Sequence, residues 1–110
     1  MMLLPGPPDL GPPASYMHAT WEEAPEELAI AYYYELSAER YVIRAVEIFA
    51  DGSLRALSFA LPNWRDVMPE RAIPSIEAIE QEPSGAFSAR TIPRREFIAM
   101  WRKAQSSQAR

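Results

Sequence analysis

The stretch that decides the fold runs from residue 40 to residue 59 and reads RYVIRAVEIFADGSLRALSF. Two runs rich in β-branched, aromatic and aliphatic residues flank the pair Asp51 and Gly52. An Asp-Gly pair supplies the positive φ angles that a tight hairpin turn requires. The stretch therefore predicts two antiparallel strands joined by a two-residue turn.

A two-residue turn would also set the register of this hairpin. It pairs Phe49 with Leu54 and Val46 with Leu57, so that apolar side chains lie opposite each other. The first run carries apolar residues on both of its faces, which predicts a strand in the interior of a sheet with cover on both sides.

The remaining segments complete an α+β domain. Residues 28–36 alternate with a period of two and contain three successive tyrosines, which favours a strand. Residues 18–23 and 87–92 are expected to be short extended segments. A proline and a serine favour a short helix near residues 74–82, and an apolar stripe predicts a helix over residues 93–106. We expect an antiparallel sheet of about four or five strands, with the C-terminal helix packed on one face.

Residues 1–16 are predicted to be a Pro-rich N-terminal tail. They contain five prolines and two glycines, and proline removes a backbone donor and fixes φ. Met17 follows directly and is an alternative translation start. Residues 17–110 are then expected to form a single α+β domain.

Composition excludes several classes of function. The net charge of −4 gives no reason to expect nucleic-acid binding, and no apolar run approaches the ~20 residues of a membrane-spanning helix. The chain has no Cys and a single His, His18, so we expect no metal and no cofactor. We also find no catalytic constellation. The sequence favours a cytoplasmic protein that is not an enzyme.

Four charged residues lie on the strands around the hairpin: Glu35, Arg40, Arg44 and Glu47. Residues 28–36 and 40–50 should run antiparallel, which would bring Glu35 close to the arginines. A structural ion-pair network is the simplest interpretation, since buried charges need partners. The alternative is a ligand site made by these side chains.

A group of aromatic and acidic residues is the candidate partner-binding surface. Tyr32 and Tyr34 are assigned to the core, so Tyr33 should point the other way. With Trp21 and Trp64 it would form an exposed aromatic patch, and the rim would be acidic. The candidate residues are Trp21, Glu22, Glu23, Tyr33 and Trp64, with Glu26 and Glu27 nearby.

From about residue 17 to residue 105 the chain resembles a family of short bacterial domains of unknown function. The most specific marker is the hairpin pattern R-Y-x-x-R-x-V-E-I-F-x-D-G at residues 40–52. Residues 1–16 are extra, and residues 57–68 are less polar than the resemblance implies. It brings no established activity. In size and fold such domains are similar to the immunity proteins that block bacterial toxins.

The leading hypothesis is a non-catalytic protein-binding module, an immunity-type or regulatory partner that acts by surface occlusion on a basic protein. The alternative is a small-molecule-binding or enzymatic domain that uses Arg40, Arg44 and Glu47 in a pocket. An uncovered edge strand would also allow a homodimer.

Overall fold

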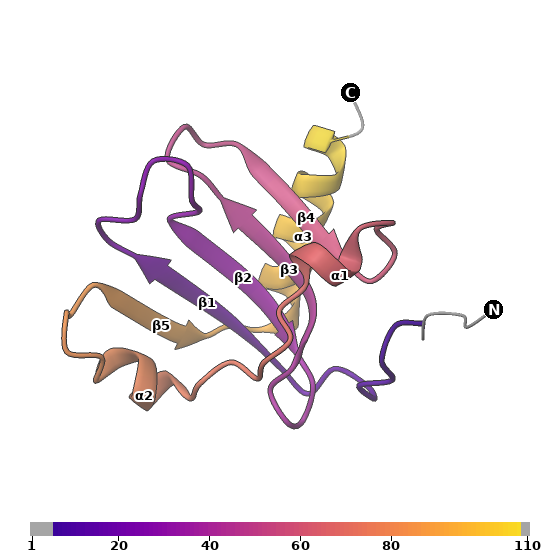
Figure 1. The fold of residues 1–110 in the computed structure, drawn as a ribbon, viewed down its shortest axis with the longest axis horizontal. Coiled ribbons are helices and arrows are strands. Elements are labelled where there is room, and N and C mark those ends of the chain that lie inside the picture. Colours follow the sequence, from indigo (N-terminus) through magenta and orange to yellow (C-terminus); the bar gives the residue numbers. More distant parts are fainter. Residues whose placement is uncertain (1–5, 109–110) are drawn as a thin grey trace.

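The computed structural model describes residues 6–108 and has the predicted α+β architecture (Figure 1). An antiparallel five-stranded sheet, in the order β4-β3-β2-β1-β5, packs against one long helix. The elements are β1 (Ser15–Trp21), β2 (Ala31–Leu36), β3 (Val42–Ile48), β4 (Leu54–Ser58), α1 (Trp64–Val67), α2 (Ile76–Glu80), β5 (Phe87–Thr91) and α3 (Arg94–Gln108).

The first strand lies in the interior of the sheet, between β2 and β5. It begins at Ser15, so the last two residues of the predicted N-terminal tail belong to the sheet. The Tyr16 hydroxyl also contacts Glu35 on β2, at 3.2 Å. The strand from the predicted hairpin, β3, lies between β4 and β2, which agrees with its apolar residues on both faces.

The β3–β4 hairpin has a three-residue loop, and the predicted two-residue turn is wrong. Gly52 N donates to the Phe49 carbonyl at 2.8 Å, and Phe49 N donates to the Ser53 carbonyl at 3.0 Å. Gly52 has a φ of 86°, the left-handed conformation that closes a loop of this length. The register therefore differs by one residue from the prediction. Val46 pairs with Ala56 in place of Leu57.

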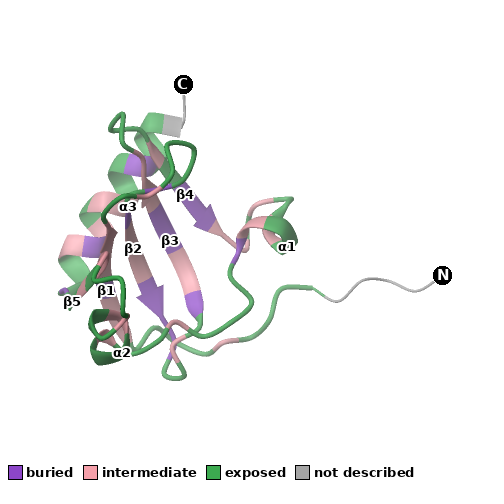
Figure 2. Cartoon of the chain, turned by 60° about the vertical axis from the view of Figure 1, so that its left-hand side comes forward, coloured by how far each residue is buried: buried purple, intermediate pink, exposed green. Residues whose placement is uncertain are grey.

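The two faces of the sheet are covered unequally. On one face, here called the helix-covered face, α3 packs through Trp101 and Ala104 against Val46 and its neighbours. The other face, the open face, is covered in part: α1 packs near β4, α2 packs near β5, and Met68 and Ile73 from the chain between these helices also pack against it. Figure 2 shows buried positions on the strands and on the side of α3 that meets them, while α1 and α2 are mostly exposed.

Candidate functional site

The open face carries two pairs of stacked aromatic rings. Trp21 on β1 stacks on Phe87 of β5, with ring centroids 5.4 Å apart. Tyr32 and Tyr34 on β2 stack on each other with centroids 5.5 Å apart. One pair joins β1 to β5, and the other lies on β2, which is the neighbour of β1 on its other side. The register of the sheet therefore brings both pairs to one surface.

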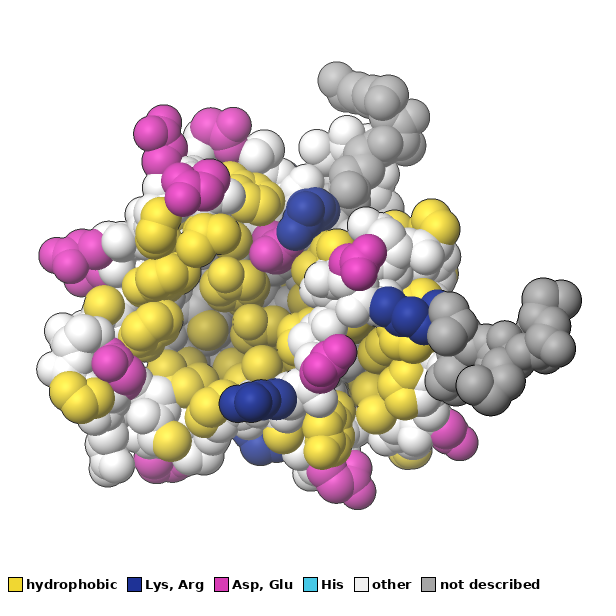
Figure 3. Space-filling model, viewed as in Figure 1, with side chains coloured by type: hydrophobic (Ala, Val, Ile, Leu, Met, Phe, Trp, Pro, Cys, Tyr) yellow, Lys and Arg dark blue, Asp and Glu magenta, His cyan; other side chains and the backbone are white. Residues whose placement is uncertain are grey.

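These rings surround a cavity of about 390 Å³, here called the open-face cavity. Ala19 on β1 pairs with Tyr32 on one side and with Ala89 on the other. Because two alanines lie side by side, the sheet surface is recessed between the larger rings. Ile73 and Ile79 line the cavity from the segment that contains α2. Figure 3 shows a hollowed hydrophobic surface over this part of the sheet.

Acidic groups lie around the open face. Glu82 lines the cavity, and Glu47 accepts a hydrogen bond of 2.7 Å from Arg55. Burial raises the pKa of the Tyr34 hydroxyl, and Tyr32 and Glu47 act in the same direction. The phenol therefore stays neutral at physiological pH.

One end of the open face has an acidic edge. The exposed glutamates of the β1–β2 loop lie here, and two of them share a hollow with Asp51 of the β3–β4 loop. Figure 3 shows acidic side chains gathered at this end of the molecule. The edge consists of Glu22, Glu23, Glu26, Glu27 and Asp51.

The structure does not bring the predicted patch of Trp21, Tyr33 and Trp64 together. Tyr33 lies on the helix-covered face, where its ring centroid is 4.5 Å from that of His18. Trp64 lies in α1 and packs edge-on against Phe59 at 5.3 Å. Trp21 lies in the open-face cavity, with the exposed acidic loop directly after it. Trp64 packs against another part of the same face and does not line this cavity.

Tyr32 and Tyr34 were predicted to lie in the core, and Tyr34 does pack against the buried cluster of the open face. Both tyrosines are half-buried and line the open-face cavity. Their rings therefore also form part of the surface of the protein. Alternation along β2 places them on the other face of the sheet from Tyr33, as predicted. The alternation pattern does not indicate which of the two faces the helix covers.

The four charged residues of the predicted network lie in three places. Glu35 pairs with Arg44 on the helix-covered face, and Glu47 pairs with Arg55 on the open face. Arg40 donates to the carbonyl oxygens of Ile73 and Pro74 at 2.9 and 2.7 Å, and so holds the chain that leads into α2. Arg40, Arg44 and Glu47 thus have separate partners and do not converge on one pocket.

The Glu35–Arg44 pair is bidentate and lies beneath α3, with Glu35 buried and Arg44 half-buried. Arg44 Nε and an Nη donate to the two carboxylate oxygens at 2.7 and 2.8 Å, and these bonds raise the pKa of Arg44. Its guanidinium carbon lies 5.3 Å from the Phe97 ring centroid and 4.9 Å from that of Trp101. Both charges are satisfied, which suits a structural role.

Among residues 6–108 there is no group of three His, Cys, Asp or Glu that could hold a metal ion. In the same part of the chain no helix is long and apolar enough to cross a membrane. The single histidine, His18, lies in β1 beside Tyr33. Burial lowers its pKa, and the nearby Arg90 acts in the same direction.

Comparison with known proteins gives a family match. A family model described as a domain of unknown function, DUF6881, matches residues 15–106. The match begins at the first residue of β1 and ends inside α3, so it spans the whole sheet. Neither a curated protein nor a solved structure matches the chain.

Proposed function

Because the chain belongs to the family of the domain of unknown function DUF6881, we propose its function from its surface: it is a non-catalytic protein-binding module. The observation that carries this proposal is the apolar, aromatic-lined cavity on the open face of the sheet. We propose an immunity-type or regulatory partner in the bacterial cytoplasm, which acts by covering a surface of its target.

The aromatic residues of the open face belong to the residue types that contribute most of the binding energy in protein interfaces. Trp and Tyr combine a large apolar area with a polar group, and they are enriched among interface hot spots. Here Trp21, Tyr32 and Tyr34 surround a recess of about 390 Å³, within the size range of ordinary ligand pockets. A protruding apolar side chain of the target would fill it.

The charge around the open face favours a basic target. Five acidic residues gather at one end, and Glu82 lines the cavity itself. Complementary charge raises association rates and orients the encounter. The same charge disfavours a homodimer through this face, since two acidic edges would repel each other. A homodimer through an edge strand remains a separate proposal.

The enzymatic or small-molecule alternative gains no support from the geometry. It needs Arg40, Arg44 and Glu47 in one pocket, but each of them contacts a different partner. The open-face cavity contains mainly hydrocarbon and aromatic side chains, so it offers few groups for acid–base chemistry.

Two adjacent tyrosines provide a matched test. Tyr32 lies on the open face and Tyr33 on the helix-covered face, and both are half-buried in β2. The target would be captured from the native host, purified, and titrated against the wild-type protein and the variants Tyr32→Ala and Tyr33→Ala. We expect Tyr32→Ala to weaken binding by about 30-fold or more, which corresponds to the ~2 kcal/mol of a hot spot, and Tyr33→Ala to weaken it less than about threefold.

Chemical denaturation would give the free energy of unfolding of each variant, and so show that both variants are folded under the conditions of the binding assay. Equal losses of affinity for the two variants would refute the open face as the interface. If no protein is captured and a metabolite screen gives a clear thermal shift instead, a ligand-binding function would replace this proposal.

A further inference from the structure

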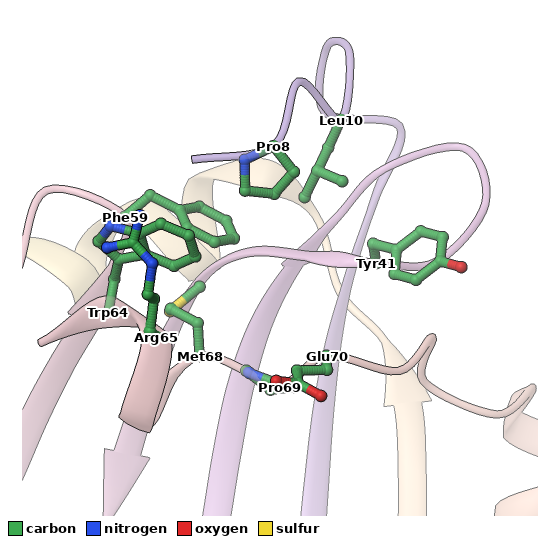
Figure 4. Close-up of a pocket in the computed structure, with 9 residues that line it drawn as sticks. All are labelled: Pro8, Leu10, Tyr41, Phe59, Trp64, Arg65, Met68, Pro69 and Glu70. Carbon is green, nitrogen blue, oxygen red and sulfur yellow. The ribbon is translucent and has the colours of Figure 1, made fainter. Parts of the chain in front are cut away.

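The Pro-rich N-terminal segment borders a second pocket, whose other lining residues are far from the segment in sequence. Pro8 and Leu10 form one wall of this pocket (Figure 4). The opposite walls come from Tyr41 and from the aromatic residues at α1, and the volume of this open pocket is about 490 Å³. This strap pocket shares no lining residue with the open-face cavity.

Few contacts shape the segment, here called the strap (residues 6–13). Gly11 has a φ of 77°, and its N–H donates to Asp9 Oδ1 at 3.1 Å, which turns the chain. Beyond the strap, Ala14 N donates to the Leu36 carbonyl at 2.8 Å and joins the sheet. Leu10 is half-buried, and the other strap residues are exposed and belong to no strand or helix. A segment with so little burial opens at low free-energy cost.

The body side of the strap pocket is aromatic. Phe59 and Trp64 meet edge to face at an interplanar angle of 67°, which gives two walls at a steep angle. The Arg65 guanidinium carbon lies 4.3 Å from the Trp64 ring centroid. Tyr41 is 38% exposed on the other side of the pocket, and the buried Met68 also lines it. Figure 4 shows these side chains on the body and the strap residues Pro8 and Leu10 above them.

We infer that the strap pocket is a second binding site, whose ligand is a proline-rich extended segment of another protein. Aromatic-lined grooves bind such segments because proline gives an extended, pre-ordered chain that loses little entropy on binding. The chain's own strap, with the sequence GPPDLGPP, forms one wall of the pocket through Pro8 and Leu10 and faces the aromatic side chains of the body. It is the competitor that an external proline-rich segment would displace.

Competition makes a quantitative prediction. A ligand that binds only the strap-open form has an apparent Kd equal to its intrinsic Kd divided by the open fraction. Leu10 is the strap residue with the most buried surface, so Leu10→Ser should raise the open fraction without touching the sheet. Binding of an external peptide should then become several-fold tighter.

The experiment uses the full chain and the acetylated, amidated peptide GPPDLGPP as the probe. The indole N–H signal of Trp64, assigned with a Trp64→Phe variant, would be followed by ¹⁵N NMR during the titration. We expect a saturable shift of this signal, no shift of the Trp21 indole, and at least a threefold lower Kd for Leu10→Ser than for the wild type. The peptide GAADLGAA, which keeps the leucine and lacks the prolines, should bind at least fivefold more weakly.

Three outcomes would overturn the inference. They are an unmoved Trp64 signal with both proteins, equal affinity for the two peptides, and a Kd that Leu10→Ser leaves unchanged or raises. An unchanged Kd would mean that the strap does not compete with the ligand, and a raised Kd would mean that the strap helps to hold it. Since Trp21 and the open-face cavity take no part, failure here would leave the proposed function standing, and failure of the open-face test would leave this site standing.

Discussion

Removal of Arg44 should destabilise the protein more than removal of any other charged side chain discussed here. Glu35 is 2% exposed, and Arg44 supplies both of its short hydrogen bonds, at 2.7 and 2.8 Å. In Arg44→Ala the buried carboxylate keeps only the Tyr16 hydroxyl, at 3.2 Å. A buried charge without its counter-charge costs far more than an exposed one.

The magnitude follows from this burial. Removing one partner of a buried ion pair typically costs about 3–5 kcal/mol. Each kcal/mol lowers the midpoint of thermal unfolding by roughly 4 °C in a domain of this size, so Tm should fall by about 12–20 °C. Loss of the guanidinium contacts with Phe97 and Trp101 adds to this effect.

Urea denaturation followed by circular dichroism would measure the free energy of unfolding. The control is Arg90→Ala, which breaks the exposed pair with Glu96, where the arginine side chain is 57% exposed. It should cost less than about 1 kcal/mol. The double variant Glu35→Gln, Arg44→Met removes both charges and should recover at least half of the loss seen in Arg44→Ala. If Arg44→Ala costs no more than Arg90→Ala, or if the double variant is no more stable than Arg44→Ala, the pair is not the buried structural contact described above.

Two further variants test local features. Gly52→Ala should lower the free energy of unfolding by about 1 kcal/mol through backbone strain at φ 86° alone, because the new Cβ would meet nothing within 4 Å. The control Gly6→Ala adds an equally open Cβ outside the sheet and should leave the urea midpoint unchanged. An equal effect of both variants would refute the strain argument. His18→Gln should reduce the fall in stability between pH 7 and pH 5. Burial lowers the pKa of His18 in the folded protein. The stability that neutral His18 contributes is therefore present above its unfolded pKa of ~6.5 and is lost as the pH falls through its folded pKa. Parallel pH profiles of Tm for wild type and variant would contradict this.

The hairpin shows which part of the fold the sequence determines. Alternation and β-branched residues predict β3 and β4 correctly, because both signals come from neighbouring residues. The loop length is different, because an Asp-Gly pair suits a two-residue turn and also a three-residue loop that ends in a left-handed glycine. The difference of one residue moves Leu57 from opposite Val46 to opposite Ala45, and so changes the face on which it lies.

The candidate site was harder to predict than the fold for a related reason. Pairing of Glu35 with Arg44 could be expected, since antiparallel neighbours with opposite charge attract each other across a sheet. The patch of Trp21, Tyr33 and Trp64 could not be tested by alternation, because its members come from three separate elements. Whether Tyr33 or its neighbours face solvent depends on where α3 packs, and that contact joins residues far apart in sequence.

The unequal cover of the two faces explains why the site lies where it does. Five strands about 4.8 Å apart span roughly 19 Å, whereas a helix with its side chains is about 10–12 Å wide. One long helix can therefore bury most of one face, and here α3 covers the Glu35–Arg44 pair. The short helices α1 and α2 do not fill the other face, which keeps a recess bordered by α2 and by the strands β1, β2 and β5. The chain could have placed polar side chains there, as antiparallel sheets with one solvated face usually do. It has Trp21, Tyr32, Tyr34 and Phe87 instead. Contiguous exposed apolar surfaces with a polar rim are typical of interaction sites, and this is why the proposed function places the partner on this face.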